Sequence, residues 1–124
     1  MNIRVELFVA CLKSSVEFYR DVLAFQVPGE LDSSYISVRK GNAVLGLSEM
    51  KNLPDHHPLK ATADQRPGLG VELVLEADDV EQVYDQVKAK AYPIHMELAD
   101  RPWGLKDFRV VDPDGYYVRI TSSK

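Results

Sequence analysis

Residues 101–121 of the chain read RPWGLKDFRVVDPDGYYVRIT, and this stretch predicts a β-hairpin. Two runs rich in strand-forming residues, 107–111 and 116–121, flank the sequence Asp-Pro-Asp-Gly. Proline presets φ for the turn, and Gly115 can adopt the positive φ that closes it. Because this turn sequence is common in proteins, a fold assignment needs support from the rest of the chain.

The N-terminal half predicts a strand, a helix and a hairpin. Residues 3–10 form a strand with one apolar face, because Val5, Leu7 and Val9 alternate with Arg4, Glu6 and Phe8. Ser14 or Ser15 is expected to cap a helix whose apolar face contains Val16, Tyr19 or Phe18, Val22 and Leu23. A short strand is expected at 25–27, followed by strands 35–39 and 43–49 around the turn Lys40-Gly41-Asn42.

The second half repeats this order after a proline-punctuated loop at 51–68. Residues 70–76 alternate as a strand, and Asp78 or Asp79 is expected to cap a helix with Val80, Val83, Tyr84 and Val87 on one face. A short strand at 92–97 leads to the closing hairpin. Arg4 corresponds to Glu72 and Ala24 to Ala91, so internal duplication is the best explanation.

The two ends of the chain together resemble the vicinal oxygen chelate superfamily, which includes glyoxalase I, extradiol dioxygenases, fosfomycin-resistance thiol transferases and bleomycin-resistance proteins. The hairpin is similar to the family's C-terminal signature. Residues 15–25, SVEFYRDVLAF, are similar to its helix motif Ser-x-x-Phe-Tyr-x-x-x-Leu-Gly-Phe, with Ala24 in place of glycine. The resemblance implies one α+β domain over residues 1–124. Two tandem βαβββ modules, about 1–50 and 69–122, would form a half-barrel cleft with the helices outside.

The resemblance also locates the positions that hold a divalent metal in the family's enzymes: Arg4, Gly46, Glu72 and Arg119. Only Glu72 among them can bind a metal, because a guanidinium stays protonated and repels cations. We therefore expect no metal, no cofactor and no catalytic residue, as in the metal-free bleomycin-resistance-like members. The alternative is a glyoxalase-, dioxygenase- or thiol-transferase-type enzyme whose metal is held by displaced ligands: Glu72, Glu6 and one of His56, His57 or His95.

The candidate ligand-binding residues are Arg4, Glu6, Tyr35, Glu72, Trp103, Tyr117 and Arg119. If Arg4, Glu72 and Arg119 point into one cleft, their charges have to pair. Such a cluster is either a structural salt-bridge network or a recognition site for an anionic or carbonyl-bearing ligand, and both can hold together. Trp103 is expected either at the mouth of the cavity or packed on the core of its own module.

Composition narrows the function. The chain has 124 residues and a net charge of -4, so nucleic acid is not an expected partner. A single cysteine fits a reducing cytoplasm, and no apolar run approaches membrane-spanning length. We expect a cytoplasmic homodimer that sequesters a small molecule, similar to bleomycin-resistance proteins in antibiotic resistance. A structural or regulatory homodimer with a filled cavity is a third possibility.

Overall fold

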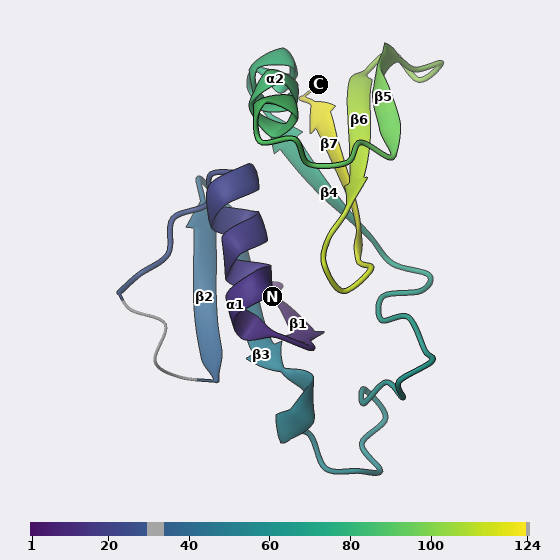
Figure 1. Ribbon diagram of the computed structural model, residues 1–124. Coiled ribbons are helices and arrows are strands. Elements are labelled where there is room, and N and C mark those ends of the chain that lie inside the picture. The colour runs from purple at the N-terminus through teal and green to yellow at the C-terminus, as the bar shows by residue number, and fades with distance from the viewer. Residues whose placement is uncertain (30–33, 124) are drawn as a thin grey trace. The chain divides into compact units, whose positions relative to one another are not determined.

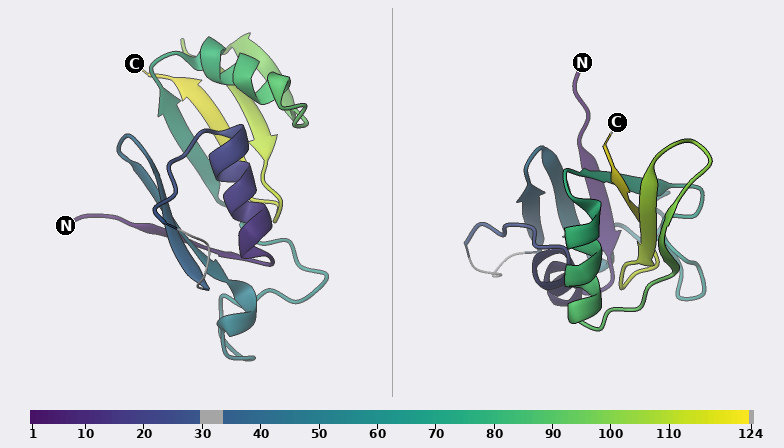
Figure 2. Two further views of the ribbon diagram at one scale, coloured as in Figure 1. Left: turned by 60° about the vertical axis from the view of Figure 1, so that its left-hand side comes forward. Right: turned by 90° about the horizontal axis from the view of Figure 1, so that it is seen from above.

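A computed structural model describes residues 1–29 and 34–123, and the chain divides into two compact units, Met1–Pro67 and Gly68–Lys124 (Figure 1). Each unit is a small sheet with a helix packed on one face, as the further views make plain (Figure 2). The predicted α+β fold of two tandem modules is confirmed. No helix within the described ranges is long and apolar enough to span a membrane.

The first unit contains a three-stranded sheet in the order β1-β3-β2, with β1 parallel and β2 antiparallel to β3. Its elements are β1 Val5–Val9, α1 Leu12–Glu17, the π-helical turn η1 Phe18–Val22, β2 Tyr35–Lys40, β3 Ala43–Glu49 and the short 3-10 helix η2 Met50–Asn52. The strand predicted at 25–27 is reduced to an isolated bridge between Gln26 and Arg39. The first two residues of the loop predicted at 51–68 lie within η2.

The first helix starts earlier than the sequence predicted. Cys11 is its N-cap and makes no capping hydrogen bond with its side chain. Ser15 is buried inside the helix, and its backbone N–H already donates to the carbonyl of Cys11 at 3.1 Å. The prediction that Ser14 or Ser15 caps this helix is therefore wrong, because Leu12 supplies an apolar contact one turn before the expected start.

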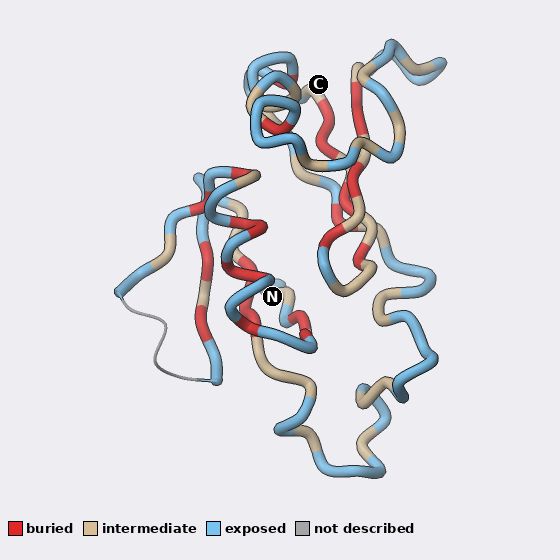
Figure 3. The backbone as a smooth tube through the Cα atoms, in the orientation of Figure 1, coloured by how far each residue is buried: buried red, intermediate tan, exposed pale blue. Residues whose placement is uncertain are grey.

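The π-helical turn after α1 contains two consecutive buried aromatic residues. Phe18 and Tyr19 are both almost fully covered, and their rings meet edge to face with centroids 4.8 Å apart. The sequence had offered these two residues as alternatives. Figure 3 shows the buried stretch that results along this helical segment.

The second unit contains a four-stranded sheet in the order β4-β7-β6-β5, with β4 parallel to β7. Its elements are β4 Glu72–Ala77, α2 Val80–Ala89, β5 Met96–Asp100, β6 Lys106–Val111 and β7 Tyr117–Ser122. Asp79 caps α2 by accepting a hydrogen bond from the Gln82 backbone N–H at 3.1 Å, as predicted. Val87 on this helix and Val110 and Val118 on the sheet form the centre of the core.

The strand predicted at 92–97 is wrong in its start. Tyr92 still belongs to the exit from α2, since its N–H donates to the Val87 carbonyl, and Pro93 has no N–H to offer a neighbouring strand. Ladder pairing begins only after His95, whose N–H donates to the Arg109 carbonyl. The Tyr92 hydroxyl donates to the Val111 carbonyl, and burial raises the pKa of Tyr92 to about 12, so it stays a neutral donor.

Candidate functional site: a charged row on the second sheet

The β6–β7 hairpin sets the register of the candidate site. Its turn is tied by Asp112, whose Oδ1 accepts hydrogen bonds from the backbone N–H groups of Asp114 and Tyr116, both at 2.9 Å. The register that follows places Arg109 directly opposite Arg119. Like charges in such a cross-strand pair repel each other. This pair therefore needs a carboxylate nearby.

Because successive side chains of a strand point to opposite faces of the sheet, the polar residues of these strands lie on the face away from α2. Phe108 and Val110 on β6 are buried on the helix side, so Asp107 and Arg109 point to the opposite face. The same alternation on β7 separates the buried Val118 from Arg119. On β4 it separates the buried Leu73 from Glu72.

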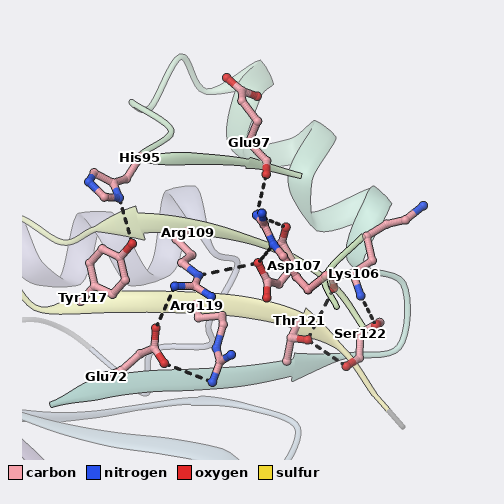
Figure 4. A network of polar contacts seen from close by, with 11 residues as sticks. Glu72, His95, Glu97, Lys106, Asp107, Arg109, Tyr117, Arg119, Thr121 and Ser122 are labelled. Carbon is pink, nitrogen blue, oxygen red and sulfur yellow. Dashed lines mark hydrogen bonds and ion pairs between the residues drawn. The ribbon is translucent and has the colours of Figure 1, made fainter. Parts of the chain in front are cut away.

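On this open face, five side chains form an alternating row of charges, hereafter the charged row (Figure 4). In order they are Arg101, Asp107, Arg109, Glu72 and Arg119. The successive nitrogen–oxygen distances are 2.8, 3.7, 3.8 and 3.1 Å. Three guanidiniums and two carboxylates leave one positive charge.

The inner half of the row is the most deeply buried. The Asp107 side chain is 0% exposed, and Arg101 closes over it by donating from Nε to Oδ1 at 2.8 Å. Arg101 Nη2 also donates to the carbonyls of Glu97 and Asp107. Asp107 Oδ2 is buried without a hydrogen-bond partner among the described residues, so this carboxylate depends on Arg101 and would be costly without it. Arg101 and Asp107 are therefore structural.

The outer half of the row is only partly covered. The side chains of Glu72, Arg119 and Arg109 are 31%, 24% and 18% exposed. Nε of Arg109 and Nε of Arg119 are shielded from water, and neither has a hydrogen-bond partner among the residues that the structure describes. Unfilled donors of this kind carry a free-energy cost. A donor that is shielded from water is also out of reach of a ligand, so only the exposed parts of Arg109 and Arg119 can contact an acceptor.

Two aromatic candidates border the row. The Tyr117 hydroxyl contacts His95 Nδ1 at 2.9 Å, and the two rings meet edge to face. Trp103 lies with its ring centroid 5.9 Å from the Arg119 guanidinium carbon and is 54% exposed. The core of its own module therefore does not enclose Trp103. Tyr116, in contrast, is buried, and its ring lies where a Cβ on Gly68 would have to be.

The candidates in the first unit gather around Glu6. Arg4 Nη2 pairs with Glu6 Oε1 at 3.3 Å, and the Tyr35 hydroxyl donates to Glu6 Oε2, also at 3.3 Å. A Cβ on Gly46 would lie 1.6 Å from Glu6 Oε2, so the carboxylate covers this glycine. Burial and the neighbouring Glu6 charge raise the pKa of Tyr35.

The sequence predicted that two guanidiniums, those of Arg4 and Arg119, flank Glu72. Of these two, only Arg119 lies in the same unit as Glu72. The second guanidinium beside Glu72 is that of Arg109, while Arg4 pairs with Glu6 inside the first unit. Arg4's part in a cluster with Glu72 stays a prediction. The signal for Arg109 was in the hairpin, because positions 109 and 119 lie at equal distances from the centre of the turn. Arg101 carried no such signal, since its contact depends on the path of a loop.

The residues at the four positions where the resemblance implies metal ligands, Arg4, Gly46, Glu72 and Arg119, do not fit a divalent cation. In the second unit these positions are Glu72 and Arg119, which pair with each other, and Arg109 adds another positive charge beside them. In the first unit, Gly46 offers no donor. A cation placed at Glu72 would have to displace two guanidiniums, so the donor set favours an internal ion pair or an anion.

Known structures share this fold over the whole chain. A protein of unknown function from Agrobacterium tumefaciens is 22% identical with a TM-score of 0.80, covering 100% of this chain and 94% of its own. TioX from a Micromonospora species is 17% identical with a TM-score of 0.74, covering 100% and 97%. A lactoylglutathione lyase, also from A. tumefaciens, is 20% identical with a TM-score of 0.72, covering 99% and 93%. At these identities the likeness establishes the fold alone.

Comparison with curated proteins gives no match. The family model described as the glyoxalase/bleomycin resistance protein/dioxygenase superfamily matches residues 3–120, which is nearly the whole chain, and the two-module fold agrees with it. The chain therefore belongs to the glyoxalase/bleomycin resistance protein/dioxygenase superfamily.

Proposed function

We propose that this protein binds a small organic molecule on the open sheet face of its second unit, without a divalent metal at the family's ligand positions. The observation that carries the proposal is the contact of Glu72 with both Arg119 and Arg109. A metal-binding carboxylate needs neutral or anionic neighbours. Here its neighbours are cations that already neutralise it.

A binding role is supported by what the face presents. It combines partly exposed charged groups with an exposed indole, a mixture found in ligand sites. In this respect the protein would act like the metal-free, antibiotic-sequestering branch of its superfamily. Cys11, a free and exposed thiol, is consistent with a cytoplasmic location as part of the same proposal.

The test is to measure metal and ligand binding in the same preparation. Protein exposed to zinc, nickel, manganese or iron and then desalted should retain far less than stoichiometric metal by elemental analysis. A thermal-shift screen in EDTA should still find stabilising small molecules, with NMR shifts at Glu72, Arg109 and Arg119. Near-stoichiometric metal that is lost in Glu72→Ala, but kept in the control Glu81→Ala, would overturn the proposal in favour of a metal-dependent enzyme.

We also propose that the protein is a homodimer. The hydrogen-bonded order leaves β1 and β2 at the edges of one sheet and β4 and β5 at the edges of the other. Exposed strand edges are usually covered or paired in natural proteins, and a second copy can do this by symmetry. Sedimentation at micromolar concentration should give twice the 14.0 kDa chain mass. A monomer would contradict this part.

A further inference from the structure

The two ends of the charged row differ in how completely they are satisfied. At one end, Arg101 donates to Asp107 and to two backbone carbonyls. At the other end, Arg119 has one ion pair, with Glu72, and its Nε has no hydrogen-bond partner within the described part of the chain. A guanidinium carries five N–H donors. The Arg119 side chain is 24% exposed and that of Arg101 is 15% exposed, so Arg119, through its terminal nitrogens rather than its shielded Nε, is the more open end of the row.

An aromatic wall stands beside this open end. Trp103 lies in the loop between β5 and β6, which is closed by hydrogen bonds from Arg101 N to Leu105 O at 2.8 Å and from Gly104 N to Arg101 O at 3.0 Å. The loop holds the indole so that the Arg119 guanidinium lies over its ring, while more than half of the residue stays exposed. A flat apolar surface thus adjoins a cation with unused donors.

Building on the small-molecule function above, we propose that Arg119 and Trp103 form a binding site for a flat organic carboxylate. A carboxylate matches the planar donor geometry of a guanidinium and can accept two parallel hydrogen bonds from it. A ring attached to that carboxylate can pack against the indole. The surplus positive charge of the row attracts an anion, although the chain as a whole carries a net charge of -4.

Glu72 has a defined role in this site. When no ligand is bound, its carboxylate neutralises Arg119 and Arg109. A ligand carboxylate has to compete with Glu72 for the same donors, so the charge of Glu72 lowers the affinity of the site for the ligand. Removing its charge should therefore tighten ligand binding. A purely structural ion pair predicts no such gain.

Three probes of the same shape separate charge from fit: benzoate, benzamide and benzamidinium are anionic, neutral and cationic. Trp103 is the sole tryptophan, so its fluorescence reports on the site directly. Benzoate should give a saturable change, benzamide should bind about tenfold more weakly, and benzamidinium should not bind. Acetate tests the contribution of Trp103, because acetate has the carboxylate but no ring. It should bind more weakly than benzoate if the benzoate ring packs on the indole.

Variants then assign the contacts. Arg119→Lys keeps the positive charge but cannot donate two parallel hydrogen bonds to a carboxylate, so benzoate should bind about tenfold more weakly. The control Arg20→Lys changes an exposed arginine of the first unit, paired with Asp21, and should leave binding unchanged. Glu72→Gln should tighten benzoate binding about fivefold. A gain in affinity cannot come from partial unfolding, so this variant keeps the test valid if Arg119→Lys folds poorly.

The inference is overturned if benzamide or benzamidinium binds as tightly as benzoate, if Arg119→Lys binds benzoate normally, if Glu72→Gln does not tighten benzoate binding, or if benzoate has no effect. These outcomes are distinct from failure of the proposed function. A ligand found in the EDTA screen without benzoate binding would leave the binding function standing and remove only the carboxylate preference. A ligand response that requires added metal would remove both.

Discussion

The two modules place different chemistry on corresponding positions of their sheets. In the first unit, Glu6 is paired in register with Gly46, and in the second unit Val74 is paired with Arg119. Glu6 folds over the bare glycine, whereas Arg119 fills its position with a guanidinium. The two modules thus share a backbone arrangement but differ in the polar content of their faces.

The two faces also differ in how firmly their charges are held. The Arg4 side chain, which pairs with Glu6, is 84% exposed, so its guanidinium is largely hydrated, although Glu6 itself is only 32% exposed. The charged row in the second unit links five partly or fully covered groups. Exposed pairs add little to stability, while covered pairs are costly to break. Equal changes of charge should therefore have unequal effects in the two units.

The largest effect is expected from Arg101→Met. This substitution replaces the guanidinium but keeps an apolar chain similar to the aliphatic stem of arginine. Among the contacts of the described residues, the buried Asp107 carboxylate is then left with the longer one to Arg109. An uncompensated buried carboxylate should lower the free energy of unfolding by about 3 kcal/mol. Urea denaturation measures this loss, and Arg20→Met serves as the matched control on an exposed pair. Equal stability of the two variants would contradict the structural role of Arg101.

A direct contrast between the units comes from Glu72→Gln and Glu6→Gln, which remove the same charge from the two faces. Loss of Glu72 leaves two guanidiniums opposite each other, at a cost of about 2 kcal/mol. Loss of the Glu6 charge should cost clearly less, because Tyr35 can still donate to the amide oxygen and Arg4 is hydrated. If the two losses measured by urea denaturation are equal, the row is no more tightly coupled than the first face.

One feature is shared by both units and should respond in the same way. Ala24 and Ala91 follow the two helices with φ angles of 61° and 56°, a left-handed conformation that is strained for an L-residue with a Cβ. Ala24→Gly and Ala91→Gly should each raise the free energy of unfolding by about 1 kcal/mol. Ala89→Gly, within α2, is the control and should be destabilising. A loss of stability at Ala24 or Ala91 would show that the strain is absorbed elsewhere.

The smallest effect is expected from Gly46→Ala. Its new Cβ would overlap the end of the flexible Glu6 side chain, which can swing away at the expense of its contact with Tyr35. The loss should be about 0.5 kcal/mol, similar to that of one weak exposed hydrogen bond. In a double-mutant cycle, Glu6→Ala should reduce the loss, and a loss that persists in full would place the clash at the Tyr35 hydroxyl, which lies 2.7 Å from the new Cβ.

Sequence patterns predicted the parts of this fold that depend on local periodicity. The alternation in β1, the turn at 112–115 and the Asp79 cap all follow from near neighbours, and all are observed. The late start of β5 depends on how the chain leaves α2, and the π-helical turn depends on the packing of Phe18 and Tyr19. Neither is fixed by periodicity alone.

The sequence predicted which charged residues form the candidate site better than it predicted the contacts between them. Glu72 and Arg119 could be named from the motifs, and the register of the hairpin could have added Arg109. The closure of Arg101 over Asp107 and the position of Trp103 depend on the path of the loop at 101–105. Loop paths are determined by tertiary contacts that a single sequence does not display.

The side-chain bonds of Asp112 bear on how the second unit assembles. This turn satisfies its own backbone groups, so β6 and β7 can pair after closing a very short loop. Pairing of β4 with β7 has to enclose α2, β5 and β6, which costs more chain entropy. The hairpin is therefore expected to be the folding nucleus of this unit, bringing Arg109 and Arg119 together before Glu72 arrives. Assembly would then pass through a stage in which two like charges face each other in water, where their repulsion is weak.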